Sequence, residues 1–122
     1  LTGAAAMAYG PVVSAVAFGG DFPRDAVKAA SDKAGEITCE MPVANDYLPL
    51  IMPEQADLSN SSGQGTPGMV TAALFLREFT NSVNWLHIDI AGASWSSKPT
   101  ELTQFGATGF GTSLMYHLVQ EL

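Results

Sequence analysis

The sequence is poor in charge and has a single cysteine, and each scarcity narrows what the chain can do. Charged residues make up 14% of the 122 residues, against about one quarter in an average soluble domain. Only five residues are basic and they are scattered, so no cluster could bind a phosphate backbone. Cys39 cannot form an internal disulfide, which fits a reducing compartment. We therefore expect no nucleic-acid partner and a cytoplasmic location.

Long apolar runs are also missing. The first twenty residues are apolar, but Gly10-Pro11 and Gly19-Gly20 interrupt them and no basic segment precedes them, so they do not resemble a signal peptide. No run reaches the length of a membrane span, and we expect no membrane partner. What is present is 47% hydrophobic residues and a net charge of −7. Such a composition predicts that much of the surface is covered by the remainder of the domain, by neighbouring subunits or by both.

Apolar β-branched runs alternate with helix-like segments along the whole chain. The predicted strands span residues 12–18, 37–41 and 85–90. The predicted helices span residues 2–9, 21–34, 69–79 and 108–122. Thr2 and Asp21 are the expected N-caps and Gly35 is the expected helix end. The alternation favours an α/β fold, a partial three-layer sandwich with a mostly parallel sheet flanked by helices.

Residues 42–68 form a long irregular stretch with four prolines and a Gly/Ser-rich end. Loops of this length in a compact domain carry function or cover a site. Plain surface coil is the alternative, and composition alone favours it.

The strand at residues 85–90 ends in a turn of small residues, Ala91 to Ser94. Ligands bind at such strand ends in α/β sheets, so the turn either admits a substrate side chain or serves packing alone. His87 and Asp89 point to the same side of the strand. We favour a structural hydrogen-bonded pair over a ligand site, because two groups without a third make a poor metal site.

A second glycine-rich turn, Gly106 to Gly111, opens the last helix. Its spacing matches neither a P-loop nor a dinucleotide motif, so close packing of the helix explains it better than phosphate binding. Neither His87 nor His117 has a nucleophile elbow nearby, and acidic neighbours disfavour a reactive Cys39 thiolate. We expect no catalytic residue in this chain.

Several ordered blocks together resemble the leucyl aminopeptidase family. The opening LTGA is similar to the turn that follows the metal-binding segment of that family. The other blocks are ADLSN at residues 56–60, VTAALFLREF at 70–79, HIDIAG at 87–92 and GATGFG at 106–111. Residues 98–105 and the WLHID opening resemble the peptidase B subgroup. We assign no chemical role to Asp57 or Asn60.

The resemblance implies a cytosolic, hexameric enzyme that removes N-terminal residues from peptides. In that family two divalent ions, zinc or manganese, activate a water and polarise the scissile carbonyl. The family's metal-ligand segment is absent here, so residues 1–122 are expected to be the C-terminal portion of the catalytic domain, with no metal ligand, no bound metal and no activity alone. The remainder of the domain is an implied partner.

Four positions correspond to the substrate side of the family's site. Leu1 and Gly3 match main-chain groups that contact substrate, and Leu1 also lies near a bicarbonate. Ala91 and Ser94 match positions that line the pocket for the first side chain of the substrate. Many relatives have Met where this chain has Ser94, which implies a roomier or more polar pocket.

Two other functions remain open at this point. A relative that kept the fold but lost the metal site would act as a structural or assembly subunit. DNA binding occurs in some bacterial relatives, but the excess of acids argues against it for this segment.

Overall fold

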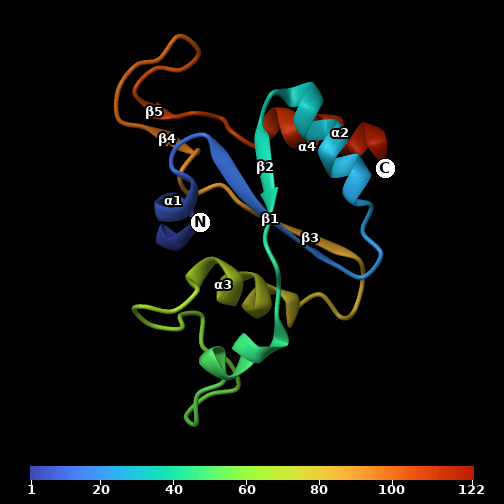
Figure 1. Cartoon of the computed structure of the whole chain (residues 1–122), viewed down its shortest axis with the longest axis vertical. Helices are drawn as coiled ribbons and strands as arrows, with labels where there is room; N and C mark the ends of the chain where they lie inside the picture. Colours follow the sequence, from blue (N-terminus) through green and yellow to red (C-terminus); the bar gives the residue numbers. More distant parts are fainter.

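The computed structural model describes residues 1–122 as a small sheet between two layers of helices (Figure 1). The helices are α1 (Gly3–Tyr9), α2 (Arg24–Ala34), the 3₁₀ helix η1 (Asn45–Ile51), α3 (Gly68–Arg77) and α4 (Thr112–Glu121). The strands are β1 (Val13–Gly19), β2 (Ile37–Glu40), β3 (Trp85–Asp89), β4 (Trp95–Ser96) and β5 (Gly106–Ala107). The α/β sandwich expected from the sequence is confirmed. None of these helices has both the length and the apolar composition of a membrane-spanning segment.

The main sheet has the order β2-β1-β3, and its pairing corrects the expectation of a mostly parallel sheet. β2 runs parallel to β1, but β3 runs antiparallel, with Ala15 opposite Asp89. β3 begins beside the end of β1, where the Asp21 amide donates to Asn84 Oδ1 over 2.9 Å. The chain leaves β2 and enters β3 at the same end of the sheet, the end where β1 stops. β3 therefore runs in the opposite direction to β1 and β2.

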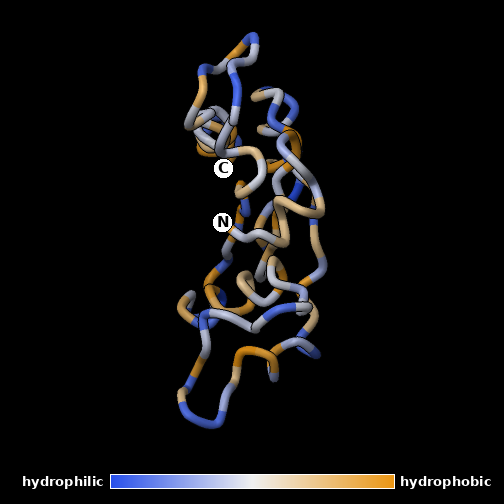
Figure 2. Tube along the Cα trace, turned by 90° about the vertical axis from the view of Figure 1, so that its left-hand side faces the viewer, coloured by the Kyte–Doolittle hydropathy of each residue, from blue (hydrophilic) through white to orange (hydrophobic).

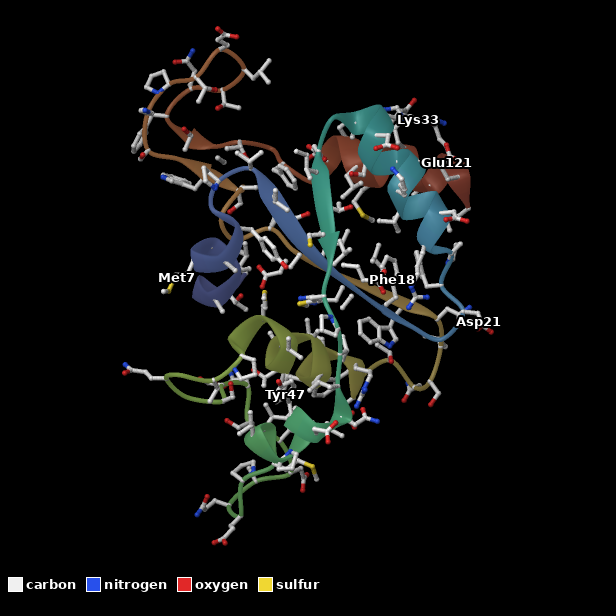
Figure 3. All side chains as sticks on the ribbon, in the orientation of Figure 1. Met7, Phe18, Asp21, Lys33, Tyr47 and Glu121 are labelled. Atoms are coloured by element: carbon white, nitrogen blue, oxygen red, sulfur yellow. The ribbon has the colours of Figure 1, made fainter.

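Each face of the sheet has its own apolar core. On one face, α2 and α4 pack through five buried residues, Ala26, Val27, Ala30, Leu114 and Leu118. On the other face, α3 and η1 pack against Ala15 and Ala17 of β1, with Tyr9 at the end of α1 beside them. The ion pair of Lys33 and Glu121 also links α2 to α4 (Figure 3). Strand side chains alternate between these two cores, which places His87 and Asp89 on the α1 and α3 face.

Local signals placed most helix ends correctly. Thr2 caps α1 by accepting the Ala5 amide over 3.1 Å, and Gly35 ends α2 in the left-handed conformation. Asp21 is not the cap of α2, which begins at Arg24 with Pro23 in the N-cap position and has no side-chain cap. The Asp21 amide is bonded to Asn84. The last helix begins at Thr112, four residues later than predicted.

Two long segments have little regular secondary structure. Residues 42–67 contain only η1, and the segment between β4 and β5 forms an arm with Leu102 95% exposed. Figure 2 shows hydrophilic residues at the tips of both ends of the elongated chain. The arm begins at Trp95, whose ring meets Phe105 edge-on at 5.7 Å between centroids.

Candidate functional site

The Asp89 carboxylate is the centre of the candidate site. It lies at the end of β3 and is 1% exposed. Its Oδ1 accepts the Thr2 amide at 3.1 Å and the Ala91 amide at 3.2 Å, and its Oδ2 accepts the Thr2 hydroxyl at 2.6 Å. One buried side chain therefore joins the N-terminal segment to the turn that follows β3.

Hydrogen bonding decides the charge of this carboxylate. Burial raises the pKa of Asp89. The hydrogen bonds from the hydroxyl and amide of Thr2 and from the Ala91 amide lower this pKa, and their combined effect outweighs that of burial, so the pKa lies below its ordinary value. Asp89 is therefore ionised at neutral pH, and each of its bonds is a charge-assisted one.

The turn after β3 packs tightly against α1. A Cβ on Gly92 would lie 2.0 Å from the Gly10 carbonyl oxygen, so only glycine fits there. The amides of Ala93 and Ser94 both donate to the Ile90 carbonyl, at 3.0 and 2.9 Å. Of the two explanations for the small residues, packing holds for Gly92 and for buried Ala93. Ala91 and Ser94 stay partly exposed and can face a ligand.

The four residues predicted to contact substrate lie near the end of β3. The main-chain nitrogen of Leu1 is 3.6 Å from Asp89 Oδ1, the oxygen that also accepts the Ala91 amide. Ser94 Oγ donates to the Ala91 carbonyl over 3.2 Å. Gly3 follows Thr2 and is exposed, with nothing within 4 Å of the Cβ it lacks. The fold brings these residues together, and their contact with a substrate stays a prediction.

His87 does not form the expected hydrogen-bonded pair with Asp89. The His87 side chain is buried and its Nε2 has no hydrogen-bond partner, while Asp89 is bonded to Thr2 and Ala91. Burial lowers the pKa of His87, and the nearby Asp89 only partly opposes this effect. His87 is therefore a neutral imidazole in the folded protein at neutral pH.

The glycine-rich turn before α4 holds a carboxylate of this chain. Glu36 Oε1 accepts the Gly111 amide at 3.1 Å, and Oε2 accepts the Leu114 amide at 2.9 Å. These are the free amides of the helix N-terminus, so Glu36 occupies the position where a phosphate would bind. Thr108 Oγ1 also donates to the Ala93 carbonyl over 2.6 Å. That bond fastens this turn to the one after β3.

A cavity of about 660 Å³ lies beside α1. The helix contributes Gly3 and Met7, and the loop of residues 60–66 covers the other side. Ser62 Oγ lies 2.8 Å from Thr71 Oγ1 and 2.6 Å from Thr66 Oγ1, which fastens the loop to α3. Part of the long irregular segment therefore lines a hollow next to the Asp89 site.

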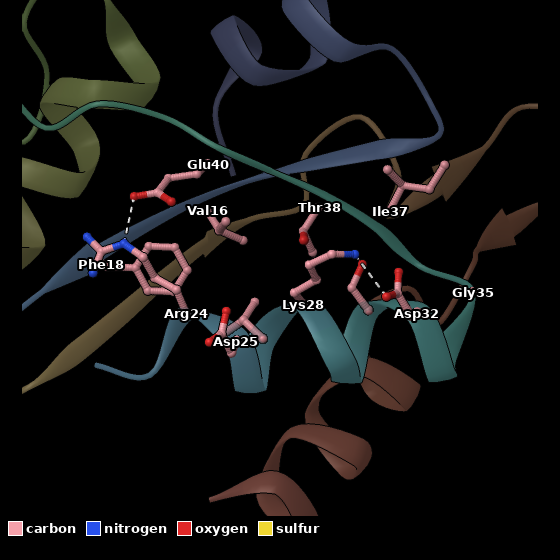
Figure 4. Close-up of a pocket in the computed structure, with 12 residues that line it drawn as sticks. Val16, Phe18, Arg24, Asp25, Lys28, Asp32, Gly35, Ile37, Thr38 and Glu40 are labelled. Atoms are coloured by element: carbon pink, nitrogen blue, oxygen red, sulfur yellow. Dashed lines mark hydrogen bonds and ion pairs between the residues drawn. The ribbon is translucent and has the colours of Figure 1, made fainter. Parts of the chain in front are cut away.

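A second hollow, of about 610 Å³, lies between α2 and β2 (Figure 4). Arg24 pairs with Glu40 at 3.0 Å, and Lys28 pairs with Asp32 at 2.9 Å. Each of its two basic side chains is thus paired with an acid, and Asp25 adds a further negative charge to the lining.

The residues of this chain do not fit the two-metal centre that the resemblance implies. No three His, Cys, Asp or Glu side chains lie close enough to hold a metal ion. Asp89 is the acid at the site, and both of its oxygens are already bonded to Thr2 and Ala91. We therefore derive no chemical step through a metal on these residues.

Comparison with known sequences identifies the class of protein to which this arrangement belongs. The profile of the cytosol aminopeptidase family, catalytic domain, matches residues 1–116. The chain therefore belongs to that family, as the ordered blocks of sequence predicted.

Two similar relatives are each named "Probable cytosol aminopeptidase". The protein from Picosynechococcus is 38% identical over 119 residues, which cover 98% of this chain and 24% of the relative. The protein from Clostridium perfringens is 40% identical over 118 residues, which cover 97% and 24%. The chain thus spans about a quarter of the length of these relatives.

Solved structures give the same result. The bottromycin maturation enzyme BotP in complex with Mn superposes with a TM-score of 0.88 at 31% identity, over 98% of this chain and 27% of BotP. A mutant of tomato leucine aminopeptidase superposes with a TM-score of 0.84 at 35% identity, over all of this chain and 23% of the enzyme. The agreement covers both helix layers and the antiparallel β3.

Proposed function

We propose that the intact protein is a metal-dependent aminopeptidase that hydrolyses N-terminal residues from peptides. This chain supplies one wall of its substrate pocket. Membership of the cytosol aminopeptidase family supports the reaction class. The observation that carries the assignment of the wall is the convergence of Leu1, Ala91 and Ser94 around Asp89.

Within that wall the exposed groups differ in kind. Leu1 and Gly3 offer main-chain groups to a peptide, and Leu1 is also the position proposed to lie beside a bicarbonate. Ala91 and Ser94 form the floor for the first side chain of the substrate. Ser94 adds a hydroxyl and little volume, so the pocket accommodates a large side chain.

The rest of the protein supplies the metals and the other partners. We propose two divalent ions, zinc or manganese, held by the remainder of the catalytic domain; the name of the BotP complex includes manganese. We also propose a cytoplasmic homo-hexamer, with peptidase B as its subgroup. Large exposed apolar side chains support contacts with further protein, namely Met7, Trp95, Leu102, Phe105 and Val119.

The reaction is tested with the intact protein, supplied with Mn²⁺, on leucine p-nitroanilide and on a leucine-initiated dipeptide. We expect release of the N-terminal residue, and none from the same dipeptide with an acetylated amine. Residues 1–122 alone are expected to release nothing. An intact protein that folds, fails to bind Mn²⁺ or Zn²⁺ and leaves both substrates intact would instead be the structural or assembly relative.

The pocket wall is tested by replacing Ser94 with Met. The longer side chain fills space in the proposed pocket, so Ser94→Met is expected to raise KM for leucine p-nitroanilide by about tenfold. The KM for alanine p-nitroanilide, whose side chain is small, should change by less than about twofold. Equal changes for both substrates would remove Ser94 from the pocket.

A further inference from the structure

We propose that Asp89 is a positioning residue that sets the width of the substrate pocket by holding its two sides together. This inference rests on the proposed function, because it concerns the wall formed by Leu1, Gly3, Ala91 and Ser94. Asp89 itself touches no substrate in this proposal, since both of its oxygens are occupied by Thr2 and Ala91.

The first step of the argument is that Asp89 holds both sides directly. Thr2 lies between Leu1 and Gly3, and it gives Asp89 both its amide and its hydroxyl. Ala91 donates its amide to Asp89 Oδ1, the oxygen that also accepts the Thr2 amide. A shift of either segment therefore breaks a charge-assisted bond to a buried carboxylate.

The second step is that the Thr2 hydroxyl carries this constraint into α1. Its one proton points to Asp89 Oδ2 at 2.6 Å, and its oxygen accepts the Ala5 amide at 3.1 Å. The proton has no second use, because a hydroxyl donates only once. Asp89 thereby fixes the direction in which the hydroxyl donates and the place where α1 begins.

The third step is that the far end of α1 is fixed independently. Gly10 and Ala6 rest on Gly92, with no room for a Cβ. With that contact as a pivot, the bonds to Asp89 determine how closely Leu1 and Gly3 approach Ala91. Small displacements there change the space available to a substrate side chain, and positioning errors of about 1 Å can cost 10²-fold in rate.

The test uses the intact protein with Thr2→Val, Thr2→Ser and Asp89→Asn. Thr2→Val keeps the shape of the side chain and loses the hydroxyl, whereas Thr2→Ser keeps the hydroxyl. We expect Thr2→Val and Asp89→Asn to raise KM for leucine p-nitroanilide at least fivefold and to alter the leucine-to-alanine selectivity. In Thr2→Ser, both the KM and the selectivity should stay within about twofold of the wild-type values, a free-energy change of about 0.4 kcal/mol at 1.4 kcal/mol per tenfold.

Glu36→Gln is the matched control, because it weakens a similar clamp at the turn before α4. We expect it to lower the midpoint of thermal unfolding without changing KM or selectivity. The proposal is overturned if KM is unchanged in Thr2→Val and Asp89→Asn, if Thr2→Ser behaves like Thr2→Val, or if Glu36→Gln raises KM as much.

Hydrogen exchange separates this proposal from the proposed function. In Asp89→Asn we expect faster amide exchange in residues 2–6 and in residues 90–94 together, whether or not the protein is a peptidase. Faster exchange in only one of the two segments would show that Asp89 does not couple them. A wild-type protein that releases no residue from peptides would refute the proposed function. The amide exchange of residues 2–6 and 90–94 would still test whether Asp89 couples these two segments.

Discussion

Two carboxylates, Asp89 at the turn after β3 and Glu36 at the turn before α4, each bond segments that lie far apart in the sequence. Asp89 bonds to Thr2, 87 residues away, and Glu36 bonds to Gly111 and Leu114, 75 and 78 residues away. The two clamps differ in burial and in what they hold. Asp89 is almost fully buried and joins two segments of the proposed pocket, whereas Glu36 is half-buried and caps one helix.

The difference shows how one chemical device serves two purposes. Glu36 is itself fastened by its main chain, whose carbonyl accepts the Ser31 hydroxyl at the end of α2. Its carboxylate therefore joins α2 and α4 within one layer of helices. Asp89 instead joins α1 to the sheet at a point where Leu1, Ala91 and Ser94 remain accessible. We expect changes at Asp89 to affect stability and substrate binding, and changes at Glu36 to affect stability alone.

The largest effect is expected for Asp89→Ala. The substitution leaves the amides of Thr2 and Ala91 and the Thr2 hydroxyl without their acceptor in a buried site. We expect a loss of about 3–5 kcal/mol in the free energy of unfolding, measured by urea denaturation of the intact protein. A loss below about 1 kcal/mol would mean that water replaces the carboxylate, and the contrast between the two clamps would disappear.

A smaller effect is expected for Gly92→Ala, which probes packing at the first turn. The new Cβ would lie 2.0 Å from the Gly10 carbonyl oxygen, so α1 must shift. We expect a loss of about 3 kcal/mol, again by urea denaturation.

Gly109→Ala is the matched substitution in the second turn. Nothing lies within 4 Å of its new Cβ, but the backbone has φ +75°, and left-handed strain alone costs about 1 kcal/mol. Equal losses at the two positions would contradict the claim that only the first turn is tightly packed.

A loss of about 1–2 kcal/mol is expected for Glu36→Ala. The N-cap position of α4 is Gly111, which has no side chain, and the Glu36 carboxylate accepts the helix amides in its place. The magnitude follows from measured losses of helix caps and from the favourable field of the helix N-terminus. Thermal unfolding of the intact protein measures it. A loss as large as that of Asp89→Ala would show that burial does not distinguish the two clamps.

The sequence predicted the clamps only in part. Thr2 was identified as a helix cap because its partner, Ala5, lies three residues away. The bond from Thr2 to Asp89 had no such local signal, and alternation along β3 indicated only which way Asp89 points. The role of Glu36 was missed, although a helix that starts at a glycine requires an acceptor from elsewhere.

For the fold, too, local features were predicted from the sequence and contacts between distant residues were not. Strands and helices were predicted from hydrophobic periodicity, which is a local property. The direction of β3 was not, because an alternation of strands and helices does not say at which end of the sheet a strand enters. That choice depends on Trp85 beside Gly19 and on the bond from Asp21 to Asn84, contacts between residues more than sixty positions apart.

The smallest effect is expected from pH, and it separates His87 from Asp89 within the same site. Burial lowers the pKa of folded His87, so between that value and about 6.5 the unfolded chain binds more protons than the folded one. Stability therefore falls as the pH drops below about 6.5, and His87→Gln should flatten this decline. The pKa of folded Asp89 is also lowered, but for an acid this means stability that is kept until the pH falls below about 3.8.

Urea denaturation of wild type and His87→Gln between pH 7.5 and pH 4.5, at about 0.5-unit steps, measures how the free energy of unfolding of each protein depends on pH. The contribution of His87 is about 1.4 kcal/mol per unit by which its pKa is lowered. Parallel curves for the two proteins would show that His87 accepts a proton without cost, and its buried Nε2 would then need a partner in the intact protein.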